Sequence, residues 1–190
     1  MIEINNIHKA FGDNVVLDGI DATFEPGKVS LIIGGSGSGK STLLKCIVGL
    51  HQPNSGKVFF DGKEFTRMSF EERVPVRKEI GMLFQNSALF DSMTVEQNIL
   101  FTLDMFTEMG KGEKNDRANF CLERVNLAGK NDLFCDEPNS GLDPATSILI
   151  DELIQDLTEE YNSTTIVVTH DMNSVMGIGA YILFLYKGQK

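Results

Sequence analysis

The residues from Gly34 to Ser41 fit the pattern G-x-x-x-x-G-K-[S/T], whose chemistry is the binding of phosphate groups. Glycine lets the backbone close around phosphate oxygens, and a helix that begins at the end of the motif adds a partial positive charge. We expect Lys40 to reach the β- and γ-phosphates of a nucleoside triphosphate and Ser41 to bind Mg²⁺, with Thr42 a candidate for the α-phosphate. An ordinary glycine-rich turn is the alternative. The predicted phosphate-binding residues are Gly34, Gly35, Ser36, Gly37, Ser38, Gly39, Lys40, Ser41 and Thr42.

Two adjacent carboxylates, Asp136 and Glu137, follow the short apolar run Leu133–Cys135. At the carboxyl end of a strand, Asp136 could hold Mg²⁺ through water, and Glu137 could polarise a water molecule that attacks the terminal phosphate. Two acids after a strand are, on their own, more often a solvated strand end. The phosphate-binding motif in the same chain favours the catalytic interpretation.

Three further residues could contribute to such a site. His170 follows the apolar run Ile166–Thr169, and a neutral imidazole there could contact the γ-phosphate or the attacking water. Gln85 follows another apolar run, and its amide could meet Mg²⁺ or the water. Phe11 lies in a glycine-bearing turn and could stack on an adenine ring. Each has a structural alternative: a histidine at a helix start, a polar loop residue and a core or exposed aromatic. Asp143 has an adequate explanation as a helix cap, and any further role for it would rest on resemblance to other proteins.

The elements that must position these residues are visible in the hydrophobic pattern. The runs Ile2–Ile7, Val15–Leu17 and Ile20–Phe24 are typical of short antiparallel strands, and Gly56–Gly62 predicts a further hairpin through its Asp-Gly pair. Continuous apolar runs predict buried strands of a parallel sheet covered by helices. These runs are Val29–Ile33, Ile80–Phe84, Thr165–Thr169 and Tyr181–Tyr186.

Helical spacing predicts the remaining elements. One helix follows the phosphate-binding motif through Val48, and another begins after Thr94, where a capping box is present. Asp143 and Pro144 open a third, through about Tyr161, in which Leu149, Leu153 and Leu157 share one face. A fourth carries Ala118, Cys121, Leu122 and Val125 on one face. The fold class expected is α/β, a parallel sheet flanked by helices with an N-terminal antiparallel β subdomain.

Length and composition limit the functions available. A chain of 190 residues fits one domain, and a net charge of −10 disfavours a protein that binds nucleic acid by neutralising phosphates. No apolar run approaches the roughly 20 residues needed to cross a bilayer, and the N-terminus shows no signal sequence, so we expect a cytoplasmic location. The cysteines Cys46, Cys121 and Cys135 are odd in number and set among apolar neighbours, which predicts reduced core thiols.

Taken together and in this order, the motifs resemble those of ABC-transporter ATP-binding subunits, over most of the chain. The resemblance implies a P-loop NTPase core that binds ATP and Mg²⁺. It also implies that Phe11 is the aromatic residue of the A-loop and Gln85 the glutamine of the Q-loop. Asp136 and Glu137 would then be the Walker B pair, Asp143 the D-loop aspartate and His170 the switch histidine.

The segment Met82–Val95 resembles the ATPases of phospholipid importers that work with Mce-type lipid carriers, the group that maintains lipid asymmetry. The resemblance implies a head-to-tail homodimer that docks on an integral-membrane permease at the inner face of the cell membrane. The acidic balance of the chain fits membrane contact through protein better than through lipid headgroups. Nucleic acid is not an expected partner.

One departure from this family concerns the signature motif, because no LSGGQ-like sequence occurs in the chain. Gln85 and Asp136 are only 51 residues apart, and only three apolar residues precede the acids. A junction near residues 131–134 explains these observations, either as a true deletion or as an omitted stretch, and we favour omission. Without that segment the chain should bind ATP and hydrolyse it poorly. The alternatives are a nucleotide-binding regulatory subunit without turnover, an ABC ATPase for another substrate, and a chromosome-maintenance or translation ATPase.

Overall fold

A computed structural model describes residues 1–84, 92–114, 116–117 and 132–189 of the chain. The chain divides into two units, one made of residues 1–85 and 130–190 and the other of residues 86–129. The predicted site residues that the structure describes all lie in the first unit. We describe each unit by itself.

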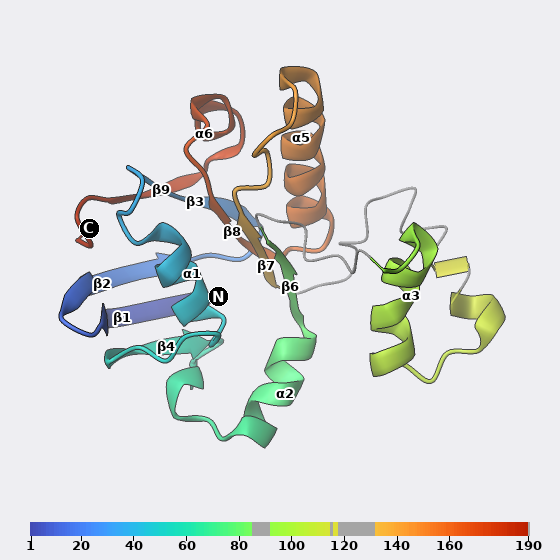
Figure 1. Cartoon of the computed structure of the whole chain (residues 1–190), viewed down its shortest axis with the longest axis horizontal. Helices are drawn as coiled ribbons and strands as arrows, with labels where there is room; N and C mark the ends of the chain where they lie inside the picture. Colours follow the sequence, from blue (N-terminus) through green and yellow to red (C-terminus); the bar gives the residue numbers. More distant parts are fainter. Residues whose placement is uncertain (85–91, 115, 118–131, 190) are drawn as a thin grey trace. The chain divides into compact units, whose positions relative to one another are not determined.

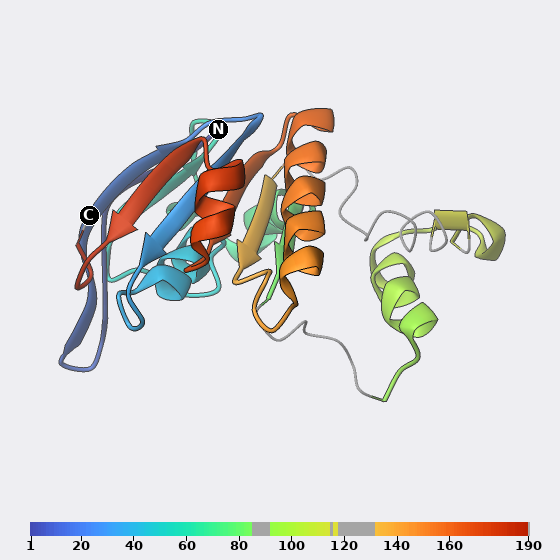
Figure 2. The ribbon, with the colours of Figure 1, turned by 90° about the horizontal axis from the view of Figure 1, so that it is seen from above.

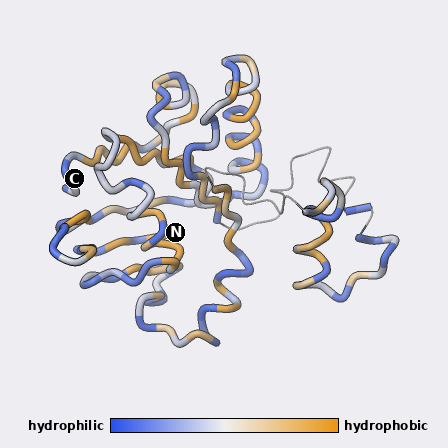
Figure 3. Tube along the Cα trace, viewed as in Figure 1, coloured by the Kyte–Doolittle hydropathy of each residue, from blue (hydrophilic) through white to orange (hydrophobic). Residues whose placement is uncertain are grey.

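A five-stranded parallel sheet forms the centre of the first unit (Figure 1). Its strand order is β6 (Ile80–Leu83), β7 (Asp132–Asp136), β8 (Thr164–Val168), β3 (Lys28–Gly34) and β9 (Tyr181–Leu185). All neighbouring strands run parallel, so the carboxyl ends of β3, β7 and β8 lie at the same edge. Figure 3 shows how hydrophobic residues concentrate on these strands. The predicted parallel sheet is therefore confirmed.

A four-stranded antiparallel sheet lies beside it, in the order β2 (Asn14–Phe24), β1 (Ile2–Phe11), β4 (Ser55–Phe60) and β5 (Lys63–Glu64). Asp61 and Gly62 form the tight turn between β4 and β5, both with positive φ, as the Asp-Gly pair predicts. The two runs Val15–Leu17 and Ile20–Phe24, given separately by the hydrophobic pattern, belong to one strand. Gly19 adopts a φ of 75° within β2, so the strand is irregular there and continues.

Helices cover both faces of the parallel sheet. Figures 1 and 2 show α1 (Lys40–Ile47) on the side of the antiparallel sheet and α5 (Pro144–Glu160) with α6 (Met172–Ile178) on the opposite face. Residues of α1 and of strands from both sheets form one hydrophobic core. On α5 the buried side chains include Asp151, Ile154 and Leu157, so the predicted face of Leu149, Leu153 and Leu157 is buried at Leu157, partly buried at Leu153 and 63% exposed at Leu149.

Two short helices precede β6 in the first unit, and α3 belongs to the second unit. The short η1 (Phe65–Arg67) and α2 (Phe70–Lys78) precede β6, and a capping box between Ser69 and Glu72 starts α2. In the second unit, α3 (Val95–Phe106) begins at the predicted Thr94, whose side chain accepts a hydrogen bond from the Gln97 amide. The helix predicted around Cys121 lies outside the described residues.

The strand β7 is longer than its three apolar residues suggest. Asp132 provides its first position, paired with Ile80 of β6 and Thr164 of β8, and is only 9% exposed. Burial raises the pKa of Asp132 to about 6, although a hydrogen bond with the Thr164 side chain opposes the shift. The sheet therefore places a buried carboxyl group in the strand that ends at Asp136.

Two of the predicted core thiols are confirmed, because Cys46 on α1 and Cys135 on β7 are free and buried. Burial raises the pKa of Cys46 to about 11 and that of Cys135 to about 12. Cys121 lies outside the described residues.

Candidate functional site

The loop between β3 and α1 has a backbone that only glycine allows at two positions. Gly34 has a φ of 151° and Gly39 a φ of 101°. A Cβ at Gly34 would lie 2.2 Å from the carbonyl oxygen of Leu185, and one at Gly39 would lie 2.9 Å from that of Val16. Gly39 is the N-cap of α1 and makes no side-chain cap bond, so no side chain competes for the first amides of that helix. This is the arrangement that suits an anion.

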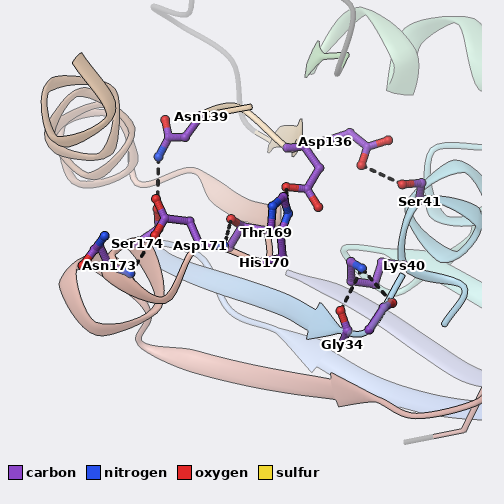
Figure 4. A network of polar contacts seen from close by, with 12 residues as sticks. Gly34, Lys40, Ser41, Asp136, Asn139, Thr169, His170, Asp171, Asn173 and Ser174 are labelled. Carbon is purple, nitrogen blue, oxygen red and sulfur yellow. Dashed lines mark hydrogen bonds and ion pairs between the residues drawn. The ribbon is translucent and has the colours of Figure 1, made fainter. Parts of the chain in front are cut away.

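Lys40 and Ser41, the first two residues of α1, point to different partners (Figure 4). The Lys40 ammonium donates to the carbonyl oxygens of Gly34 at 2.9 Å and Gly35 at 3.1 Å, inside the loop. The Ser41 hydroxyl donates to Asp136 Oδ1 at 2.8 Å, across 95 residues of sequence. The fold therefore brings the end of β7 to the start of α1, as the predicted roles require.

Glu137 and His170 form a second pair at the same edge of the sheet. His170 Nδ1 lies 2.7 Å from Glu137 Oε2, and the side chains are 72% and 11% exposed, respectively. Glu137 has a φ of 54°, a left-handed conformation that costs energy in a residue with a side chain. Its amide donates to the carbonyl of Val168 at 2.8 Å, which ties the turn after β7 to the end of β8.

Phe11 borders a cavity of about 370 Å³ next to the phosphate-binding loop. Its ring is 48% exposed, lies edge-on to His51 at 5.5 Å and has the Lys9 ammonium 4.9 Å from its centroid. An exposed ring beside the loop can stack on a planar base. The cavity is lined by Phe11, Val16, Gly37, Ser38, Gly39, Lys40, Ser41 and Thr42.

Asp143 caps α5, as its position before Pro144 predicts. Its Oδ1 accepts hydrogen bonds from the amides of Ala145 at 3.0 Å and Thr146 at 3.1 Å. A hydrogen bond from the Thr146 hydroxyl lowers the pKa of Asp143. Within this chain the side chain has a complete structural role. Gln85, predicted as a catalytic and Mg²⁺-binding residue, lies outside the described residues.

The oxygen atoms of Ser41 and Asp136 are the kind of ligand that Mg²⁺ prefers, so these two residues fit the ion. Cavity size alone would not identify this site. A larger cavity of about 460 Å³, lined in part by Asp21, Lys28 and Tyr181, contains none of the predicted site residues.

Sequence reasoning missed several residues of the site. Val16 lines the cavity from β2, and no motif marks it. Asn139, Asp151 and Ser174 form a buried polar cluster behind Glu137. These three residues are up to 35 positions apart, and none belongs to a periodic pattern that would connect them.

Comparison with known proteins agrees with this geometry. A family model described as ABC transporter matches residues 17–142. The methionine import ATP-binding protein MetN of Photobacterium profundum is 33% identical over 219 residues, covering all of this chain and 63% of that protein. The probable ribonucleotide transport ATP-binding protein mkl of Mycobacterium tuberculosis is 32% identical over 198 residues, covering 90% of this chain and 55% of that protein. The chain therefore spans 55 to 63% of the length of these relatives.

Solved structures extend the comparison. A dimeric ATP-binding cassette in a post-hydrolysis state with ADP and Pi superposes with a TM-score of 0.89 at 27% identity, covering all of this chain and 96% of that one. The CbiO1 protein of Clostridium perfringens, part of the transporter complex CbiONQ, gives a TM-score of 0.84 at 26% identity, covering 99% and 85%. In the described part of the chain, no helix has both the length and the apolar character needed to span a bilayer.

Proposed function

This chain belongs to the ABC transporter family, and we propose that it binds and hydrolyses ATP to power a permease in the membrane. The observation that carries the proposal is the meeting of three strand ends at the loop from Gly34 to Thr42. β3 leads into the loop, β7 supplies Asp136 and Glu137, and β8 leads to His170. The relatives named as import and transport proteins favour turnover over a nucleotide-binding module without it.

The residues divide the chemistry between them. Lys40 and the first amides of α1 would bind the phosphates, and Phe11 would stack on the adenine ring. Ser41 and Asp136 would hold Mg²⁺, with Gln85 a further ligand, and the ion when bound neutralises negative charge on the phosphate oxygens. Glu137 would accept a proton from the attacking water, while His170, held at Glu137 Oε2, would orient that water or the terminal phosphate.

The partners we propose are a second copy of the chain and an integral-membrane permease. The dimeric structures of similar cassettes support a homodimer. By resemblance to the family, the two copies would lie head to tail and Asp143 would also contact the nucleotide-binding region. A net charge of −10 argues against binding to nucleic acid and to anionic lipid headgroups. We therefore propose a cytoplasmic chain that contacts the inner face of the membrane only through protein.

For the transported substrate we propose a phospholipid. The support is the resemblance of Met82–Val95 to lipid-transport ATPases, in the segment where such subunits meet their permease. The similar proteins named above carry other substrates in their names, methionine and ribonucleotide. Identification of the permease that copurifies with the chain therefore tests the substrate separately from ATP hydrolysis.

We further propose that the chain is one ATP-binding domain that lacks an internal segment near residues 131–134, the one that carries the signature motif. The alignment with the methionine import protein supports missing positions, because it runs over 219 residues and includes all 190 residues of this chain. At least 29 positions of that alignment therefore have no counterpart here. The location near residues 131–134 is supported by the short spacing from Gln85 to Asp136. Sequencing the coding DNA across residues 131–134 distinguishes an omitted stretch from a true deletion.

The decisive experiment measures ATP hydrolysis by the chain purified with its permease. We expect turnover that Glu137→Gln abolishes while MgATP still binds, and a higher rate after the matching segment of a relative is inserted at residue 131. A version of that insert with a mutated signature motif is the control. Tight MgATP binding without turnover, even in the inserted form, would instead support a regulatory module, and hydrolysis stimulated by nucleic acid would contradict the transport assignment.

A further inference from the structure

A buried amide connects three elements behind the Glu137–His170 pair. Asn139, in the loop between β7 and α5, is 9% exposed. Its Nδ2 donates to Asp151 Oδ1 on α5 at 2.8 Å and to Ser174 Oγ on α6 at 3.0 Å. Asp151 is 8% exposed and Ser174 is 1% exposed, so the whole cluster lies away from water. Figure 4 shows Asn139 and Ser174 on the side of the site opposite to Lys40.

The chemistry of the cluster indicates why an amide occupies this position. Burying an amide costs free energy unless its polar atoms are hydrogen-bonded. Asn139 uses its amino group twice, while its Oδ1 is buried without a hydrogen-bond partner among the described residues. The two hydrogen bonds that Asn139 makes in this cluster are therefore both donated by its amino group. Without the amino group of Asn139, the Asp151 carboxylate would lose a hydrogen-bond donor, and because Asp151 is buried, water could not readily take the donor's place.

The cluster joins the two segments that carry the pair. Asn139 follows Glu137 by two residues, and the turn between them is closed by the Ser140 amide, which donates to the Glu137 carbonyl at 3.1 Å. Ser174 follows His170 by four residues and lies on α6, whose N-cap is Asp171. An amide that holds α6 against the turn after β7 therefore limits how far His170 can move from Glu137.

We infer that Asn139 is a positioning residue for ATP hydrolysis: through Asp151 and Ser174 it holds the Glu137–His170 pair together without touching the nucleotide. The inference rests on the proposed ATPase function. The side-chain hydrogen bonds of Lys40 and Ser41 within the described residues go to Gly34, Gly35 and Asp136 and not to this cluster, so we expect phosphate binding to change little. The effect should fall on the chemical step, where small displacements have large consequences.

The test compares Asn139→Ala with the unaltered chain bound to its permease. We expect kcat to fall about tenfold or more, with KM for ATP within about twofold, because only the hydrolytic groups are displaced. Asp151→Asn keeps an acceptor oxygen and should retain most of the activity, whereas Asp151→Ala should resemble Asn139→Ala. Glu152→Gln, which alters the neighbouring exposed carboxylate on α5, is the matched control and should change neither constant.

A second measurement does not depend on turnover. The ¹⁵N signals of the His170 ring report whether Nδ1 is hydrogen-bonded to Glu137, and Asn139→Ala should shift them toward those of a free imidazole. If Asn139→Ala does not fold, Ser174→Ala tests the same connection from α6, with a smaller shift in the same direction. Unchanged ring signals with unchanged kcat would overturn the inference, and so would equal losses of kcat and ATP affinity. If the unaltered chain binds ATP without hydrolysis, the proposed function fails while the ring signals still decide the role of Asn139.

Discussion

The loop from Gly34 to Thr42 and the loop from Glu137 to Asp143 place functional groups at the same edge of one parallel sheet, but different forces hold them in place. The first is shaped by glycines at positive φ and by backbone groups, and its lysine bonds to carbonyls five and six residues away. The second contains a glutamate at a φ of 54° and is held by side chains from the segment after β8, from α5 and from α6.

The shape of the first loop is therefore determined by residues within the loop, whereas the shape of the second is determined by residues distant in sequence. A loop determined by its own glycines should fold to the same shape in many surroundings, and its chemistry is readable from a short motif. A loop held by distant side chains depends on the packing of three elements, so mutations far from the nucleotide can change it. The following experiments test that division, from the largest expected effect to the smallest.

The largest effect is expected in the first loop. Lys40→Ala should weaken MgATP binding by about a hundredfold, roughly 3 kcal/mol, because it removes charged hydrogen bonds to phosphate. Lys45→Ala, on the same helix but outside the cavity lining, is the control and should bind normally. Titration with a fluorescent nucleotide measures both. Normal affinity in Lys40→Ala would remove the assignment of this loop to phosphate.

The next effect concerns stability and tests the strand that supports the second loop. The pKa of Asp132 is raised to about 6 in the folded chain, against 3.8 for an ordinary aspartate. The folded state therefore holds this proton more tightly, and the stability contributed by the neutral form is lost as the pH rises from about 4 through 6, by about 3 kcal/mol at most.

Asp132→Asn removes this titration. In urea unfolding, the variant should match the unaltered chain near pH 4 and exceed its stability by a growing amount up to about pH 7. Asp13→Asn, which alters an exposed carboxylate in the turn between β1 and β2, is the control for general charge effects. A stability difference that does not change with pH would show that Asp132 is not the group that titrates.

A smaller effect is expected for the base-binding side of the first loop. Phe11→Ala should weaken ATP binding about tenfold, since stacking on a base contributes roughly 1 to 3 kcal/mol. Phe11→Tyr keeps the ring and should restore the affinity. Titration with ATP and with tripolyphosphate separates the contributions, because loss of the ring should not affect the ligand that has no base. Equal weakening for both ligands would argue for a structural role of Phe11.

The smallest effect tests the strain at Glu137. Both Glu137→Gln and Glu137→Asn remove the carboxylate charge, but asparagine accepts the left-handed conformation more readily. The asparagine variant should therefore be more stable than the glutamine variant by about 1 kcal/mol in urea unfolding. At Glu152, in the regular helix α5, the same pair should show the opposite order, because asparagine is the poorer helix former. If the asparagine and glutamine variants had the same order of stability at Glu137 and at Glu152, the strain assigned to the backbone of Glu137 would be contradicted.

Much of the fold followed from the sequence, because strand and helix periods and turn residues act locally. The Asp-Gly turn after β4, the capping box of α3 and the Asp143 cap of α5 were all predictable, and the structure has them. The continuous β2 was not, because a glycine at positive φ can either end a strand or bend it. The length of β7 was underestimated because it includes a carboxyl group that pattern reading assigns to the surface.

The site was predictable to the extent that it consists of motifs. Sequence order placed Asp136 and His170 at strand ends, and the sheet brings Asp136 to Ser41 and His170 to Glu137. The Asn139 cluster could not be found in this way, because its bonds join positions 12 and 35 residues apart with no periodic signal. The role assigned to Gln85 and the helix predicted around Cys121 stay predictions, since these residues lie outside the described part of the chain.

The burial of Cys135 has a practical consequence for the strand that carries Asp136. A thiol with a pKa of about 12 stays protonated at neutral pH, and only the thiolate attacks an alkylating reagent. Iodoacetamide should therefore react with Cys135 only during the brief excursions in which β7 detaches from β6 and β8. The rate at which the Cys135 sulfur is labelled, followed by mass spectrometry, therefore measures how often β7 opens, and no probe has to be introduced into the chain.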